Sequence, residues 1–253
     1  MINVPILPAT AFLRKTAIQL ATNFHLPVVD TFSSALTKFL YLTTERLELH
    51  DMVTTTGPIY VDFVGGKLGY RYRHAGGQRQ PLAKAVGLKC GTAPIVVDAT
   101  AGLGRDSFIL AYLGCQVQML ERSPVVAALL HDGLQRALQH SQIGSIVNER
   151  LHLVHSDTKH WLSKLPQTSQ PEVIYLDPMY PHRQKSALVK KEMRMFRTIV
   201  GNDLDAPSLL DIALFTAKRR VVVKRPKLAP ILGNKQPNFC IKSKNTRFDI
   251  YLC

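Results

Sequence analysis

Four short apolar runs in the second part of the chain are each followed by an acidic residue, and this pattern constrains the fold most strongly. The runs are Ile95–Val97, Val117–Leu120, Leu151–Val154 and Val173–Leu176, and helix-like segments separate the first three of them. Alternation of buried strands with helices is typical of a parallel sheet built from βαβ units. We therefore predict a doubly wound α/β sheet whose parallel strands end at one common edge.

The remaining segments extend this prediction. In the second part, helices are expected at Phe108–Leu113, Pro124–Gln139, Ala187–Ile199 and Pro207–Ala217, a fifth strand at Arg220–Lys224, and a closing antiparallel hairpin at Phe239–Lys242 and Arg247–Leu252. In the first ninety residues, helices are expected at Ala11–Asn23, Ser33–Leu49 and Leu82–Val86, with a hairpin that turns at Gly65-Gly66. We predict a small N-terminal α+β subdomain at residues 1–90 and a main domain at residues 91–253.

The acidic residues after the four runs are expected to lie close together. They are Asp98, Glu121, Asp157 and Asp177, although only 18 of the 253 residues are acidic. Ligands of doubly wound sheets bind in the crevice at this edge. The fifth strand instead ends in Lys224-Arg225, so the edge becomes basic there. Such a crevice suits a small cationic ligand beside an anionic one.

The loop after the first run favours a nucleoside that carries no phosphate. Gly102 and Gly104 allow the backbone to approach a ligand closely, and Glu121 follows where a carboxylate can accept both ribose hydroxyls. Ser107 replaces the third glycine of the dinucleotide fingerprint, and loop carboxylates such as Asp106 would repel a pyrophosphate. These features disfavour NAD and favour S-adenosylmethionine, with its ribose, adenine and positive sulfonium. A structural turn for the glycines and a helix-dipole role for Glu121 are the alternatives.

The stretch Asp177-Pro178-Met179-Tyr180 follows the fourth run with groups suited to methylating a planar amine. The lone pair of an exocyclic amine on a nucleobase is delocalised into the ring, which makes the amine a poor nucleophile. The Asp177 carboxylate and the Pro178 carbonyl could accept its hydrogen bonds and stabilise the positive charge that develops during methyl transfer. Tyr180 could stack on the base. An ordinary turn is the alternative, because Asp and Pro are common turn residues.

Positive charge is concentrated in one part of the chain. The net charge is +14, and residues 183–247 contain 16 basic and 4 acidic residues. A single-signed excess of this kind is typical of nucleic-acid binding. The residues expected to contact RNA phosphates are Arg183, Lys185, Lys190, Lys191, Arg194, Lys224 and Arg225. An anionic membrane surface is less favoured, because no terminal helix combines a basic face with a strongly apolar one.

Other protein classes are disfavoured by the sequence. The longest uncharged stretches have 14 residues, fewer than the roughly 20 that a membrane-spanning helix needs. Basic residues do not precede an apolar run in the order of a secretory signal, so we expect a cytoplasmic protein. The four cysteines have no CxxC spacing and no nearby histidine in a ligand pattern, so neither a metal nor a disulfide framework is expected.

Several longer segments resemble known methyltransferases. Asp-Pro-Met-Tyr at 177–180 is similar to the fourth motif of amino-group methyltransferases, Asp or Asn-Pro-Pro-aromatic, with Met179 in place of the second proline. The segments that resemble ribosomal RNA small subunit methyltransferase J are Val61–Gly66, Val97–Asp106, Met119–Arg122, Tyr175–Arg194, Arg220–Pro226 and Arg247–Tyr251. The resemblance implies a class I, Rossmann-like methyltransferase domain, with a mostly parallel sheet and a C-terminal antiparallel hairpin. It also implies methyl transfer from S-adenosylmethionine to the N2 amine of a guanine in 16S ribosomal RNA, with ribosomal RNA or the small subunit as partner.

The same resemblance implies a set of cofactor contacts. They are Arg105, Asp106, Glu121, Arg122, Asp157, Thr158 and Asp177, with Asp157 standing where the family has a small hydroxyl residue. Asp98, Gly102 and Gly104 complete the predicted cofactor site, and Asp177, Pro178 and Tyr180 form the predicted catalytic group. The alternative functions are an adenine amino-methyltransferase acting on RNA or DNA, a non-catalytic ribosome-assembly factor, and a nicotinamide-dependent oxidoreductase.

Overall fold

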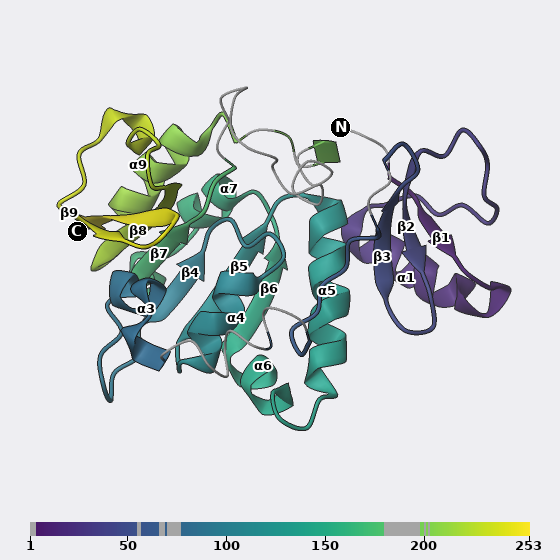
Figure 1. The fold of residues 1–253 in the computed structure, drawn as a ribbon, viewed down its shortest axis with the longest axis horizontal. Coiled ribbons are helices and arrows are strands. Elements are labelled where there is room, and N and C mark those ends of the chain that lie inside the picture. The colour runs from purple at the N-terminus through teal and green to yellow at the C-terminus, as the bar shows by residue number, and fades with distance from the viewer. Residues whose placement is uncertain are drawn as a thin grey trace.

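The computed structural model describes residues 4–54, 57–65, 69, 77–179, 198–199, 201 and 203–253, and within them the strands form two sheets (Figure 1). The first sheet holds β1 (Ile6–Pro8), β2 (Lys38–Leu42) and β3 (Leu47–Asp51). The second holds β4 (Ile95–Asp98), β5 (Gln116–Glu121), β6 (Leu151–His155), β7 (Val173–Leu176), β8 (Arg220–Pro226), β9 (Phe239–Lys242) and β10 (Thr246–Leu252). The helices are α1 (Arg14–Phe24), α3 (Pro81–Val86), α4 (Arg105–Tyr112), α5 (Pro124–Leu138), α6 (Gly144–Arg150), α7 (Thr158–Ser163) and α9 (Ala206–Thr216). Short 3-10 turns lie at Ala11–Leu13, Gly77–Arg79, Gln167–Ser169 and Leu232–Asn234.

The larger sheet has the predicted doubly wound topology. Its strand order is β6-β5-β4-β7-β8-β10-β9; β4 to β8 run parallel, and β10 pairs antiparallel with both β8 and β9. The order reverses at β4, which lies between β5 and β7. A crevice therefore forms at the carboxyl ends of these three strands.

Alternating side chains of the parallel strands supply two separate hydrophobic layers. Successive residues of a strand point to opposite faces of the sheet. One face joins α3, α4, α5 and α6 and includes Val96, Met119, Tyr175 and Val222. The other face joins α7 and α9 and includes Val97, Leu120, Ile174 and Val221. Each of these strands is thus buried on both faces, which explains why it reads as a continuous apolar run.

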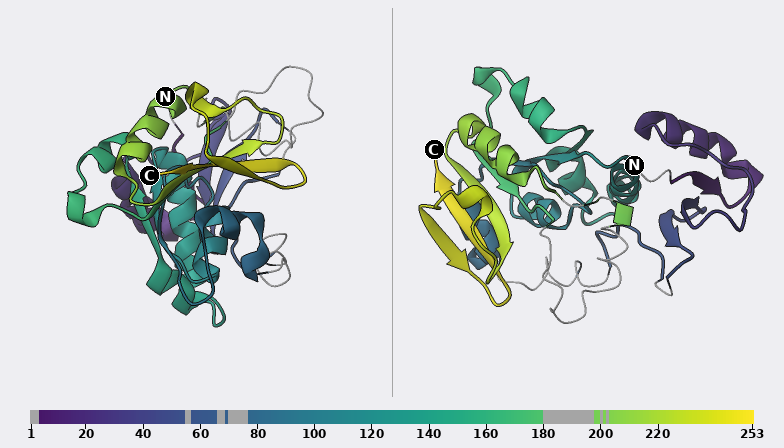
Figure 2. Two further views of the ribbon diagram at one scale, coloured as in Figure 1. Left: turned by 90° about the vertical axis from the view of Figure 1, so that its left-hand side faces the viewer. Right: turned by 90° about the horizontal axis from the view of Figure 1, so that it is seen from above.

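The N-terminal sheet packs beside α5, on the side away from the β9–β10 hairpin (Figures 1 and 2). Phe24 of α1 contacts His131 of α5, with ring centroids 5.5 Å apart. Ile6 of β1, Leu40 of β2 and Leu49 of β3 belong to the same hydrophobic cluster as side chains of α4 and α5. Helix α3 precedes residue 90 yet packs against β8, β9 and β10 of the larger sheet. The division of the chain at residue 90 stays a prediction.

The helix expected at Ser33–Leu49 is wrong, because this segment contains β2 and the start of β3. The two strands pair antiparallel from Lys38 opposite Asp51 to Leu42 opposite Leu47. The Thr43 hydroxyl accepts hydrogen bonds from the backbone N–H groups of Glu45 and Arg46, which stabilises the turn between them. The leucines of this segment fit a helix as well as strands, and the pairing of β2 with β1 and β3 decides between the two.

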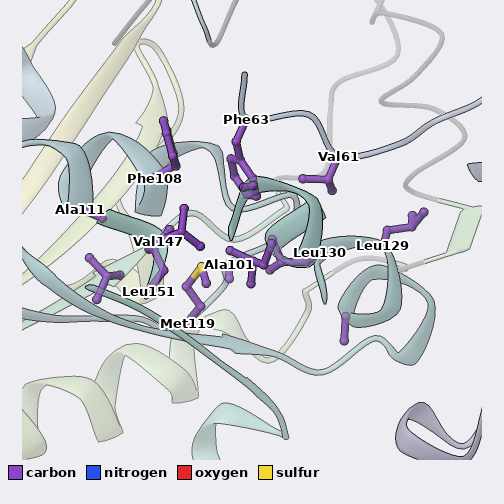
Figure 3. Close-up of a cluster of buried hydrophobic side chains, with 14 of the residues drawn as sticks. Val61, Phe63, Ala101, Phe108, Ala111, Met119, Leu129, Leu130, Val147 and Leu151 are labelled. Atoms are coloured by element: carbon purple, nitrogen blue, oxygen red, sulfur yellow. The ribbon is translucent and has the colours of Figure 1, made fainter. Parts of the chain in front are cut away.

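Residues 57–65 connect the N-terminal sheet to α5 and α4. Ile59 exchanges two backbone hydrogen bonds with Leu49, of 2.7 and 3.0 Å. Further along, Val61 lies over α5, and Phe63 stacks on Phe108 of α4 with ring centroids 5.0 Å apart (Figure 3). A Cβ on Gly133 of α5 would overlap the Val61 side chain, so glycine allows this close approach.

Some predictions concern residues outside the described ranges. The hairpin expected around Gly65-Gly66 is wrong in its first arm: residues 59–64 form no strand, and only Ile59 forms a bridge, with Leu49. Its second arm lies outside the described residues apart from Gly69, as does the helix at Ala187–Ile199 apart from its last two residues. In the described part of the chain, no helix is both long and apolar enough to cross a membrane. Within the same residues, no three His, Cys, Asp or Glu side chains are grouped to hold a metal ion. All four cysteines are free thiols.

Candidate active site

A cavity of about 750 Å³ opens at the carboxyl ends of β4, β5 and β7. This volume lies in the range of small-molecule and cofactor sites. The structure brings all four strand-end carboxylates to the cavity lining: Asp98, Glu121, Asp157 and Asp177. It also brings Lys224 of β8 to the same lining, so a cation lies among the acidic groups.

The glycine loop between β4 and α4 has the backbone geometry expected for close approach to a ligand. Gly102 and Gly104 have φ values of +55° and +69°, a region that side chains disfavour. A Cβ on Gly104 would also lie 2.7 Å from Leu130 of α5. The loop therefore needs glycine at position 104 both for its conformation and for packing.

Glu121 fixes this loop from the end of β5. Its two carboxylate oxygens accept hydrogen bonds from the backbone N–H groups of Gly102, at 2.9 Å, and Ser123, at 2.7 Å. Each carboxylate oxygen has a second lone pair that a ribose hydroxyl could use. Burial raises the pKa of Glu121 to about 7, and these backbone hydrogen bonds oppose the shift.

Asp98 shapes the loop from the end of β4. One carboxylate oxygen accepts the hydroxyl of Ser107, and the other accepts the N–H of Thr100 at 3.2 Å. Its side chain is almost wholly buried, and burial raises the pKa of Asp98 to about 7. Asp98 lines the cavity, but its described contacts hold the protein's own loop in place.

Asp177 belongs to a cluster of polar side chains from β7, β8 and α4. The Lys224 ammonium donates to Asp177 at 2.8 Å and to Asp106 at 2.6 Å, and the Tyr175 hydroxyl donates to Asp106 at 2.8 Å. Burial raises the pKa of Asp177, and Lys224 opposes that shift. Burial alone would lower the pKa of Lys224, but Asp177 and Asp106 outweigh it and raise the pKa. Lys224 therefore stays charged and neutralises part of the acidic wall.

The backbone after β7 is held in place at two points. The Asp177 N–H donates to the Thr100 hydroxyl at 2.7 Å, which ties the segment to the glycine loop. The Met179 N–H donates to Asp203 at 2.7 Å. Pro178 between them lines the cavity and has no N–H of its own.

Arg122, predicted to contact the cofactor, is held by two aspartates that were not predicted. Its guanidinium forms ion pairs with Asp203 and Asp205, and Lys159 of α7 joins Asp205 at 2.9 Å. Both aspartates lie just before α9 and line the cavity. Neither follows a predicted strand, and their partners are distant in the chain, so strand-end reasoning could not find them.

The other predicted cofactor residues lie at the cavity with differing contacts. Arg105 begins α4 and lines the cavity. The Asp157 carboxylate caps α7 by accepting the N–H of His160 at 3.0 Å. The Thr158 hydroxyl donates to the Ala99 carbonyl at 2.7 Å and is buried, so it supports the β4 loop.

The predicted RNA-contacting residues fall into two groups. The base-stacking residue Tyr180 and the basic residues Arg183, Lys185, Lys190, Lys191 and Arg194 lie outside the described residues. Lys224 and Arg225 are described, but the structure does not place them together. Lys224 lines the cavity, whereas Arg225 is 4% exposed and donates to the Pro230 carbonyl at 3.0 Å. Neighbouring residues of a strand point to opposite faces of the sheet. The prediction that Arg225 faces RNA phosphates beside Lys224 is therefore wrong, because the Arg225 side chain is buried.

One wall of the cavity comes from the residues before α3. Pro58, Tyr60 and Asp62 line it, and Arg46, in the turn between β2 and β3, lies over the Tyr60 ring, 3.7 Å from its centroid. The only sequence signal for this wall was the resemblance at Val61–Gly66.

Comparison with known proteins agrees with this geometry. The SAM_MT family model, which describes a SAM-dependent methyltransferase, matches residues 19–253. A protein of Thioalkalivibrio sulfidiphilus named Ribosomal RNA small subunit methyltransferase J is 51% identical, with 96% of this chain and 95% of that protein covered. One of the same name from Aeromonas salmonicida is 56% identical, with 84% and 85% covered.

A solved structure shows the same fold. The crystal structure of the SAM-dependent methyltransferase NGO1261 from Neisseria gonorrhoeae has a TM-score of 0.78 and is 36% identical. The similarity covers 98% of this chain and 96% of that one. S-adenosylmethionine is accordingly the cofactor, and the predicted class I fold is confirmed. With its cavity at the topological switch point and relatives matched along most of their length, this chain belongs to the ribosomal RNA small subunit methyltransferase J family of SAM-dependent methyltransferases.

Proposed function

We propose that the protein transfers a methyl group from S-adenosylmethionine to the exocyclic N2 amine of a guanine in 16S ribosomal RNA. The observation that carries this proposal is the convergence of Glu121, Asp177 and the Pro178 backbone on one cavity. The names of the relatives support ribosomal RNA of the small subunit as the substrate. Such a substrate implies a cytoplasmic enzyme whose partner is the RNA or the small subunit.

The acidic part of the cavity fits the cofactor. S-adenosylmethionine supplies an electrophilic methyl group on a positively charged sulfonium. Glu121 would hold the ribose hydroxyls, Gly102 and Gly104 would let the backbone approach the nucleoside, and Asp106 and Arg122 lie at the same lining. A buried carboxylate gains from a nearby cationic ligand because the pair is poorly screened there.

Asp177 and Pro178 would act on the target amine. The carboxylate and the Pro178 carbonyl are hydrogen-bond acceptors, so they would orient the amine and stabilise positive charge as it develops on nitrogen. The Thr100 and Asp203 contacts to the backbone at 177 and 179 preorganise this segment. Removal of one preorganised group of this kind typically costs about 3–4 kcal/mol in the barrier.

The carboxylates of Asp106 and Asp177 favour guanine over adenine as the target base. On guanine, the N2 amine lies beside the N1–H donor, whereas on adenine the N6 amine lies beside the N1 acceptor. Ionised Asp106 and Asp177 can only accept hydrogen bonds. The adjacent N2 amine and N1–H donors of guanine therefore match these two carboxylates, whereas the N1 acceptor of adenine would face a carboxylate oxygen. Lys224 beside the carboxylates is a donor that could match the guanine O6.

Nucleoside analysis tests the substrate. Small ribosomal subunits that lack the modification are incubated with the protein and methyl-labelled S-adenosylmethionine, and the RNA is digested for mass analysis. We expect label in N2-methylguanosine. Label in adenosine, or on DNA alone, would refute the guanine assignment.

An Asp177→Ala variant tests the mechanism against a purely RNA-binding role. We expect methyl transfer to be abolished and RNA affinity, measured by filter binding, to stay close to that of the parent protein. Normal turnover in this variant would refute the role of Asp177.

A further inference from the structure

We propose that Asp203 is a positioning residue that holds the Asp177–Met179 segment in register with the cofactor-binding end of β5. One carboxylate oxygen accepts the Met179 N–H at 2.7 Å, and the other forms an ion pair with Arg122. Arg122 directly follows Glu121, which anchors the glycine loop. The inference rests on the role proposed above for Asp177 and Pro178.

A carboxylate is required at position 203 because both of its partners are donors. The Arg122 guanidinium and the Met179 N–H each need an acceptor, and an ionised Asp supplies two. An asparagine has one acceptor oxygen, so its amide would face one of the two donors with an N–H group. The Asp203 side chain is only 13% exposed, so water cannot easily replace the lost acceptor.

Methionine at position 179 makes this contact possible. The wider amino-methyltransferase motif has proline at the corresponding position, and proline has no N–H to donate. In this chain, the Met179 N–H is captured by an aspartate that lies 24 residues further along. The segment therefore gains through Asp203 a restraint that a proline would supply through its ring.

Asp205 provides a matched control within the same loop. Its carboxylate also holds Arg122, at 3.0 Å, and adds Lys159, at 2.9 Å. Among the described contacts, Asp205 has none with Met179. A change at Asp205 therefore disturbs Arg122 while the acceptor for Met179 remains.

The first experiment compares Asp203→Asn with Asp205→Asn. Cofactor affinity is measured by calorimetry without RNA, and kcat is measured with saturating S-adenosylmethionine and unmodified small subunits. We expect both variants to weaken cofactor binding through Arg122. Only Asp203→Asn should also lower kcat, by roughly 10- to 100-fold, as expected for a lost hydrogen bond to a charged group. Equal kcat values in the two variants would overturn the proposal.

The second experiment removes the donor instead of the acceptor. Met179→Pro, checked for folding by its melting temperature, removes the N–H while its ring restrains the backbone, so kcat should stay closer to that of the parent than in Asp203→Asn. Adding Asp203→Asn to Met179→Pro should then lower kcat no further. If the fold-losses in kcat of the two single variants multiply in the double variant, the two residues do not act through each other, and the proposal is overturned. If Met179→Pro does not fold, the comparison of Asp203→Asn with Asp205→Asn still decides the question.

Failure of the proposed function would be seen separately. Normal turnover in Asp177→Ala would refute the role of the segment, whatever the result at Asp203. Methylation of adenine would refute the substrate, but the kcat comparison between the Asp203 and Asp205 variants would keep its meaning.

Discussion

Replacement of Asp98 by asparagine should stabilise the protein at alkaline pH. Asp98 is 2% exposed, and burial raises its pKa from 3.8 to about 7. Between about pH 4 and pH 7 the folded protein keeps a proton that the unfolded chain has released, so the free energy of unfolding falls as pH rises. The slope is about 1.4 kcal/mol per pH unit, and the whole interval amounts to roughly 4 kcal/mol.

Asparagine removes this penalty because it does not ionise. Its amide can still accept the Thr100 N–H and donate to the Ser107 hydroxyl, so the loop contacts have a replacement. We expect the variant to match the parent near pH 4 and to exceed its free energy of unfolding by up to about 4 kcal/mol at pH 8.

Urea unfolding of the parent and Asp98→Asn at several pH values between 4 and 9 measures this difference directly. The shift at Glu121 occurs in both proteins and cancels in the comparison. A stability difference that stays constant with pH, or that grows toward acid pH, would refute the reasoning about Asp98.

Three further predictions concern other parts of the site. Lys224→Met should move the acid limb of the kcat/KM profile to higher pH, because Lys224 opposes the rise that burial causes in the pKa of Asp177. Lys224→Arg keeps the charge and should restore most of the profile. An acid limb that does not move in Lys224→Met would contradict this reasoning. Gly104→Ala should lower the free energy of unfolding, measured by urea titration, by about 1–3 kcal/mol. The reason is that position 104 has a positive φ and that a Cβ there would overlap Leu130. An unchanged free energy of unfolding would contradict the described loop geometry. RNA affinity should fall steeply as salt rises from 50 to about 200 mM, as counterion release from phosphates requires, and a flat response in filter binding would contradict a role for the basic segment.

The parallel sheet was predictable because its strands are buried on both faces. A short apolar run such as Val173–Leu176 is typical of a strand that is buried on both faces. Because βαβ units make consecutive strands run parallel, the carboxyl ends of these strands lie at one edge of the sheet. The positions of Asp98, Glu121 and Asp177 at the cavity follow from the same rule.

The N-terminal strands and the Asp203 contacts were not predictable by the same reasoning. Strand β2 is paired with β1, more than 30 residues earlier, and its pairing decides a conformation that local propensity leaves open. Asp203 reaches Arg122 across 81 residues of chain, and no periodic pattern encodes that contact. Both depend on tertiary neighbours that a single sequence does not reveal.

The close packing of Val61 over Gly133 ties the residues that follow the N-terminal sheet to a helix of the larger sheet. Residues 57–65 contribute one wall of the cofactor cavity, and within this segment Val61 packs against α5 and Phe63 against α4. A fragment that begins at residue 91 would keep every strand of the larger sheet. It would nevertheless lose the Val61 and Phe63 contacts with α5 and α4 and the part of the cavity lining that residues 58–62 supply, so we expect such a fragment to be less stable and to bind the cofactor more weakly.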